Sequence, residues 1–115
     1  KVMLTNTAPV ATNTLKSDIT EISAGNGYTA GGNTITVSSS AQTSGTYKNV
    51  MADSVFTAAG GSIGPFRYAV LYNSTPASPL APLIAWWDYG SAVTLADGET
   101  FTWDADPTNG VIQIV

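Results

Sequence analysis

The sequence predicts an all-β domain, an antiparallel β-sandwich or barrel of seven to eight short strands. Apolar and polar residues alternate in several segments, turn residues separate these segments at regular intervals, and no segment sustains apolar residues at helical spacing. A chain of 115 residues has room for one hydrophobic core, so we expect a single domain over residues 1–115. Residues 1–32 are mostly polar and predict an irregular N-terminal arm, and residues 33–115 predict the strand-rich core.

Five segments carry the strand pattern most clearly. In residues 65–73 the alternation predicts one face with Phe66, Tyr68 and Val70 and an opposite face with Arg67. Residues 82–90 are apolar on both faces, which is typical of a central strand covered on each side. The other three segments are residues 33–39, 99–105 and 110–115, and weaker candidates are residues 1–5, 46–52 and 92–95.

Turn residues lie between these segments. Asp97–Gly98 suits the positive φ angles of a tight hairpin turn between two apolar segments. A second turn is predicted at Pro107, Asn109 and Gly110. Residues 73–83 contain three prolines, which predicts an extended and exposed connection.

The composition excludes several classes of function. The chain has no cysteine and no histidine, so thiolate zinc sites, cysteine nucleophiles and histidine general bases are absent. Its net charge is −4, and its four basic residues are too few and too scattered for nucleic-acid binding. No apolar run approaches the roughly 20 residues of a membrane span. We expect a soluble protein with no catalytic, cofactor-binding or metal-binding residues.

A glycine-rich run, AGNGYTAGG, occupies residues 24–32. A phosphate-binding loop would need a following lysine and a helix, and here a predicted strand follows without a lysine. We therefore expect Gly27, Gly31 and Gly32 to serve a positive φ angle or a close approach of another chain. Tyr28 is predicted to be an anchor with a buried ring, and its neighbour can be this subunit or another one.

The acidic residues offer two weaker hypotheses. Asp104, Asp106 and Asn109 resemble a calcium loop, but the spacing of a helix-loop-helix site is not met, and a turn capped by carboxylates is favoured. A carboxylate pair for glycosidic cleavage could be drawn from Asp88, Glu99, Asp104 and Asp106. Any set of eight carboxylates offers such pairs, so this hypothesis is weak. Arg67 is expected to pair with Asp88 or Asp104 in a structural role.

Aromatic residues gather in the second half of the chain. Trp86 and Trp87 are consecutive in a predicted strand, so they must face opposite sides. One is expected in the core, and the other faces a second layer, a carbohydrate or a partner chain. Both tryptophans join Tyr28, Gly27, Gly31 and Gly32 as candidate interface residues.

Four segments in order carry a resemblance to a known family: DITEISAGNGYTAGG, FRYAVLYNST, PLIAWWDYG and LADGETFTWDADPTNGVIQI. They resemble small virion structural proteins of tailed bacteriophages, in which similar motifs correspond to residues 27–32, 67–70, 83–90 and 103–105 of this chain. The resemblance covers residues 18–115, and residues 4–17 depart from the family's pattern.

The resemblance implies a capsid decoration, or cement, protein on the surface of the virion, made in the cytoplasm of a bacterial host. Its partners would be the major capsid protein and copies of itself in a homo-oligomer, with a trimer as one option, and neither nucleic acid nor a membrane. The alternative is a carbohydrate-binding or receptor-binding module on a tail or fibre, with Trp86 or Trp87 as a stacking platform. A hydrolase with paired carboxylates is the third hypothesis.

Overall fold

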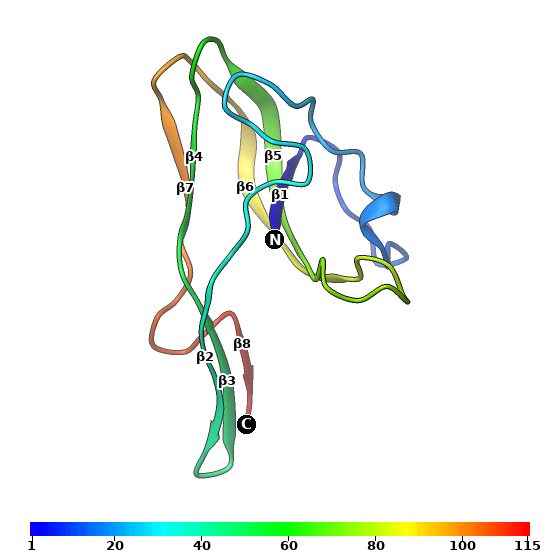
Figure 1. Ribbon diagram of the computed structural model, residues 1–115, viewed down its shortest axis with the longest axis vertical. Helices are drawn as coiled ribbons and strands as arrows, with labels where there is room; N and C mark the ends of the chain where they lie inside the picture. Colours follow the sequence, from blue (N-terminus) through cyan, green and yellow to red (C-terminus); the bar gives the residue numbers. More distant parts are fainter.

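The computed structural model describes all 115 residues, and it confirms the predicted all-β class (Figure 1). Eight strands form three antiparallel sheets, whose strand orders are β1-β5-β6, β2-β3-β8 and β4-β7. The chain also contains one short 3-10 helix, η1. The elements are β1 (Val2–Thr5), η1 (Lys16–Asp18), β2 (Val37–Thr43), β3 (Thr46–Met51), β4 (Ser54–Thr57), β5 (Ile63–Tyr72), β6 (Leu83–Leu95), β7 (Thr100–Trp103) and β8 (Ile112–Ile114).

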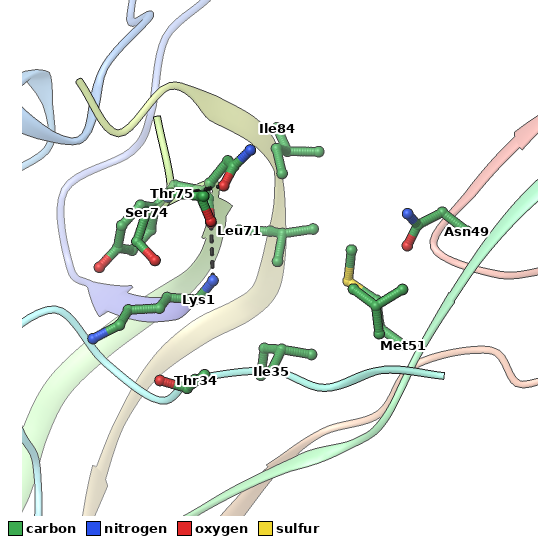
Figure 2. Close-up of a pocket in the computed structure, with 12 residues that line it drawn as sticks. Lys1, Thr34, Ile35, Asn49, Met51, Leu71, Ser74, Thr75 and Ile84 are labelled. Atoms are coloured by element: carbon green, nitrogen blue, oxygen red, sulfur yellow. Dashed lines mark hydrogen bonds between the residues drawn. The ribbon is translucent and has the colours of Figure 1, made fainter. Parts of the chain in front are cut away.

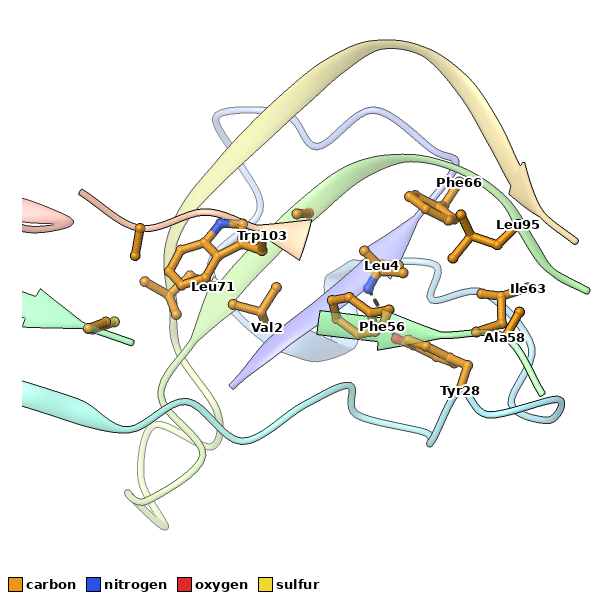
Figure 3. Packing of buried hydrophobic residues seen from close by; sticks show 13 residues of the cluster. Val2, Leu4, Tyr28, Phe56, Ala58, Ile63, Phe66, Leu71, Leu95 and Trp103 are labelled. Atoms are coloured by element: carbon orange, nitrogen blue, oxygen red, sulfur yellow. Dashed lines mark hydrogen bonds between the residues drawn. The ribbon is translucent and has the colours of Figure 1, made fainter. Parts of the chain in front are cut away.

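The body of the protein is a small sandwich. Sheet β1-β5-β6 packs against the two-stranded sheet β4-β7, and the main core lies between them (Figure 3). Aromatic rings from both sheets meet there: Phe56 of β4 and Phe66 of β5 each lie within 6.5 Å of Phe101 of β7. The other buried members of this cluster are Val2, Leu4, Tyr28, Met51, Ala58, Ile63, Ala69, Leu71, Leu95, Trp103 and Ala105.

The weaker strand prediction at residues 1–5 is confirmed, so the irregular segment that was expected over residues 1–32 begins only after Thr5. The run Val2–Thr5 is β1, which pairs with β5 and is completely buried, because both of its faces are covered. Leu4 points into the main core, and Met3 joins a second cluster with Val70 and Tyr72 on the opposite face. Residues 6–32 are irregular as expected, but they pack on the body: Ile19 covers the second cluster and Tyr28 lies in the main core.

The true projection of the molecule is sheet β2-β3-β8, which we call the arm (Figure 1). It extends away from the body along the longest axis, and the whole chain measures 48 × 28 × 26 Å. The radius of gyration is 14.7 Å, whereas a compact domain of this length has about 13.4 Å. The arm therefore comes from residues that the sequence analysis placed in the core.

Local details of β5 and β6 also differ from the prediction. Register shifts on both sides of Phe66 turn its ring into the main core beside Ala69 and Leu71, so the expected single aromatic face is split. β6 merges two predicted strands, and it is an edge strand, not a central one. The Asp97–Gly98 turn connects β6 to β7, which pairs with β4, so this turn crosses between sheets and is not a hairpin.

Candidate functional site

Tyr28 is an anchor, and its neighbour is its own chain. Its side chain is 3% exposed and its ring stacks on Phe56 at a centroid distance of 5.9 Å. The hydroxyl accepts a hydrogen bond from the backbone N–H of Leu4 at 3.1 Å and donates one to Oε1 of Glu21 at 2.7 Å. Of the two neighbours that the sequence left open, the structure therefore shows this subunit, and a role of Tyr28 between chains stays a prediction.

The neighbouring glycines also make close approaches within the chain. A Cβ atom on Gly27 would overlap the backbone carbonyl of Thr57, and one on Gly32 would overlap that of Val2. Gly31 donates its N–H to Glu21 and accepts a hydrogen bond from the hydroxyl of Tyr72 at 2.7 Å. The predicted positive φ angles are confirmed at Gly27, Gly31 and Gly32, and the close approaches seen here hold the glycine-rich loop on β1 and β4 of the same molecule.

Glu21 is the centre of this loop's polar network. Burial acts to raise the pKa of its carboxyl, but hydrogen bonds from Lys16, Tyr28 and Gly31 outweigh it and lower the pKa below its usual range. Lys16 completes the network with an ion pair at 2.9 Å. Burial and the neighbouring carboxylate raise the pKa of Tyr28, so its hydroxyl remains a donor. This network is structural.

The two tryptophans of β6 face opposite sides, as predicted. Trp86 packs edge-on against Tyr68 at 5.8 Å, and Trp87 packs edge-on against Trp103 at 5.1 Å. Neither is a core residue, since Trp86 is 47% exposed and Trp87 is 38% exposed. Of the candidate interface residues, Trp86, Trp87 and Gly27 are exposed, whereas Tyr28, Gly31 and Gly32 are buried.

Trp87 lies in an open groove between the edges of β6 and β7. The groove has a volume of about 190 Å³, and the aromatic residues Tyr89, Phe101 and Trp103 share it with Trp87. Its polar lining residues are Arg67, Asp88, Thr102 and Asp104, and Ala69 completes the lining. We call this feature the aromatic groove.

A bulge of β6 forms one side of the aromatic groove. Four residues, 89–92, lie opposite the single residue Arg67 of β5, so Tyr89 is pushed out of the regular ladder. Arg67 binds both carboxylate oxygens of Asp88 at 2.7 and 2.8 Å, and Asp88 also accepts the backbone N–H of Gly90. The expected ion pair with Asp88 therefore exists, and it fastens the bulge at an exposed position.

Two of the candidate carboxylates, Asp88 and Asp106, do not meet the needs of a general acid for glycosidic cleavage. The guanidinium of Arg67 lowers the pKa of Asp88, whereas a general acid needs a raised pKa. Backbone and side-chain hydrogen bonds from Asn109 lower the pKa of Asp106, which also accepts the N–H of Thr108. Asp106 thus caps a turn, as favoured from the sequence, and no group of three acidic residues is placed to hold a metal ion.

The arm is the second accessible surface, and neither of its faces is covered. Every residue of β2 is exposed and no residue of β8 is buried. Cross-strand pairs place Tyr47, Ile112 and Ile114 on one face, which we call the isoleucine face, and they place Ala41, Lys48 and Gln113 on the other. The isoleucine face carries the larger apolar side chains, and Ile114 is 62% exposed.

The arm touches the body only at its base, beside a groove of about 290 Å³ (Figure 2). Met51 at the end of β3 belongs to the main core, with Ile35 and Val111 packed against it. Figure 2 shows Met51 and Ile35 across the groove from Leu71 and Ile84 of the body. The rest of the arm has no layer of the same chain beneath it.

The sequence did not lead us to expect the arm. One signal could have found its tip: Ser44–Gly45 lies between two segments of strand pattern, and both residues have positive φ angles, as a two-residue hairpin loop requires. The low charge of residues 37–51, which contain only Lys48, was a second signal.

The chain contains no helix long and apolar enough to cross a membrane. Searches against protein-family models, curated proteins and solved structures find no match to this chain.

Proposed function

We propose that the protein is a structural component of a tailed-bacteriophage virion, a decoration protein that binds the major capsid protein and copies of itself on the capsid surface. The observation that carries this proposal is the arm, a three-stranded sheet with both faces exposed. A sheet of this size needs an apolar layer against one face for independent stability. The layer is absent from this chain, so another protein chain supplies it.

The chemistry of the arm supports a protein partner. The isoleucine face has its two isoleucines on the outer strand β8, beside Tyr47 and Asn49 of the central strand β3. Lys48, on the opposite face, is the one charged residue of β2, β3 and β8. Interface cores are depleted in charged residues, because desolvation of a charge is costly. The outer strands β2 and β8 also leave their outward backbone groups free to pair with a strand of another chain.

A repeated lattice makes weak contacts sufficient. Each arm contact that holds one copy raises the effective concentration of its neighbours, so an array is held more tightly than any single contact would allow. A decoration protein needs no catalytic group, and this chain offers no histidine or cysteine. The glycine-rich loop, anchored by the buried Tyr28, contributes to the stability of the body.

Co-sedimentation with capsid shells of the phage that encodes the chain tests the proposal. The wild-type chain is expected to pellet with the shells in a saturable manner. The substitution Ile114→Asp puts a charge on the isoleucine face and is expected to reduce binding at least about tenfold, a loss of 1.4 kcal/mol.

A matched control is Val55→Asp, which adds the same charge to an exposed position of β4 on the body. It is expected to bind shells like the wild-type chain. Failure of the wild-type chain to bind, or equal loss of binding in both variants, would contradict a role of the arm in decoration.

A further inference from the structure

We propose that the aromatic groove is a binding site for a neutral saccharide. This inference goes beyond the decoration function and does not depend on it, since the groove lies on the body and the arm is a separate surface. It is carried by the exposed rings of Trp87 and Tyr89, by the way the fold holds them, and by the charges of the groove.

Both rings are held from behind by rings of β7. Trp87 lies edge-on to Trp103, with centroids 5.1 Å apart and planes at 70°. Tyr89 lies edge-on to Phe101 at 5.6 Å and 79°. Trp103 is buried in the main core, and Phe101 packs against it. The two exposed rings are therefore fixed before any ligand arrives, which reduces the ordering cost of binding.

The bulge of β6 places the Tyr89 side chain in the aromatic groove. A bulge re-aims a side chain, and here residues 89–92 leave the ladder where β5 contributes Arg67 alone. The Arg67–Asp88 pair and the Asp88–Gly90 hydrogen bond close this bulge. Tyr89 remains 60% exposed although it is supported on one side. An exposed ring that is supported on one side adds little to a core, whereas it offers a flat ligand a surface on which to stack.

The shape of the groove suits ring-by-ring contact. Its volume of about 190 Å³ is below the roughly 300–1,000 Å³ of pockets that enclose a whole drug-sized ligand. A pyranose ring presents a face of C–H groups with positive partial charge, which the negative face of an aromatic ring attracts. A saccharide chain that lies along β6 would place successive rings on Trp87 and Tyr89.

The charges of the groove select a neutral ligand with hydrogen-bond donors. Arg67 is neutralised by Asp88, and Asp104 adds a carboxylate that belongs to neither ion pair of the chain. The groove thus has a net negative charge, which repels phosphates and anionic sugars. Carboxylate oxygens accept hydrogen bonds from sugar hydroxyls, as the few polar groups of a ligand site must.

Isothermal titration of the full-length chain with soluble hexasaccharides tests the proposal. The neutral probes are maltohexaose, cellohexaose and chitohexaose, and the anionic probe is hexagalacturonate. At least one neutral probe is expected to bind saturably, and hexagalacturonate is expected to bind more weakly than that probe. Asp104→Asn is expected to lower the affinity for the neutral probe, because the substitution replaces one carboxylate oxygen, a hydrogen-bond acceptor, with an amide donor.

The chain offers matched variants for this test. Trp87→Ala and Tyr89→Ala are each expected to lower the affinity at least about tenfold. Trp86→Ala removes the same residue type from the opposite face of β6 and is expected to leave the affinity unchanged. Tyr89 is the safer variant if the loss of Trp87 disturbs Trp103, because Tyr89 is more exposed.

Any of the following results would overturn the proposal. The first is that no neutral probe binds at its solubility limit. The second is that hexagalacturonate binds as tightly as the best neutral probe, or that Trp86→Ala weakens binding as much as Trp87→Ala does. The third is that Tyr89→Ala lowers the mass of an oligomer in ultracentrifugation without a loss of saccharide affinity, which would make the groove an interface between copies.

Discussion

The hydroxyl of Tyr28 lies 2.7 Å from Oε1 of Glu21 and donates a hydrogen bond to that oxygen. The same hydroxyl accepts the N–H of Leu4, so one phenol joins the glycine-rich loop, the segment before it and the buried strand β1. The glycine-tyrosine motif therefore fastens the N-terminal segment to the body, and its contribution is to stability.

Removal of this hydroxyl is expected to destabilise the fold. Tyr28→Phe leaves the N–H of Leu4 without its acceptor and removes one of the three donors to the Glu21 carboxylate, which costs about 1–3 kcal/mol in the free energy of unfolding. Urea denaturation of the wild type and the variant measures this difference in the free energy of unfolding. Tyr89→Phe, at an exposed ring, serves as the control and is expected to stay within about 0.5 kcal/mol of the wild type. Equal stability of the two variants would contradict the buried role of Tyr28.

Glu21 is expected to make the stability depend on acid. Its pKa is lowered in the folded chain, so its contribution is present above the unfolded-state pKa and is lost as the pH falls through the lower folded-state value. Glu21→Gln is expected to be less stable than the wild type at neutral pH, and the difference should narrow under acid. Denaturation curves across this range provide the measurement, and a constant difference would refute the coupling.

Gly32 is expected to tolerate alanine much less than Gly45 does. Both glycines have positive φ angles, for which an L-residue pays about 1–2 kcal/mol. A Cβ atom at Gly45 has open space, whereas one at Gly32 overlaps the carbonyl of Val2 and adds about 1–3 kcal/mol of overpacking. Thermal or urea unfolding of Gly32→Ala and Gly45→Ala compares the two. If Gly32→Ala is no less stable, β1 does not pack against the loop as described.

Local patterns predicted the class of the fold and most of its strands. Alternation in residues 99–105 identified β7, which has one face in the core and one outside it. Alternation in residues 65–73 identified β5, although both of its faces are buried, one in the main core and one in the second cluster. The same reasoning placed Trp86 and Trp87 on opposite faces of one strand. It also anticipated that Arg67 would find a carboxylate partner.

Pairing between distant strands could not be read from these patterns. The Asp97–Gly98 turn looks like a hairpin, but its two strands enter different sheets, which depends on contacts of β7 with β4. Burial of β1 depends on β5, about 65 residues further along the chain, and on the glycine-rich loop. The arm was assigned to the core because an exposed strand can show the same alternation of apolar and polar residues as a strand that is buried on one face.

Amide hydrogen exchange of the arm tests the central claim most directly, that β2, β3 and β8 are stabilised by another protein chain. In the dilute, monomeric chain the amides of Thr46–Met51 are expected to exchange much faster than those of Ile63–Tyr72 in the body. On capsid shells the arm amides are expected to become protected, while those of β5 change little. Arm amides that are as protected in the monomer as those of β5, with no further change on shells, would contradict the account.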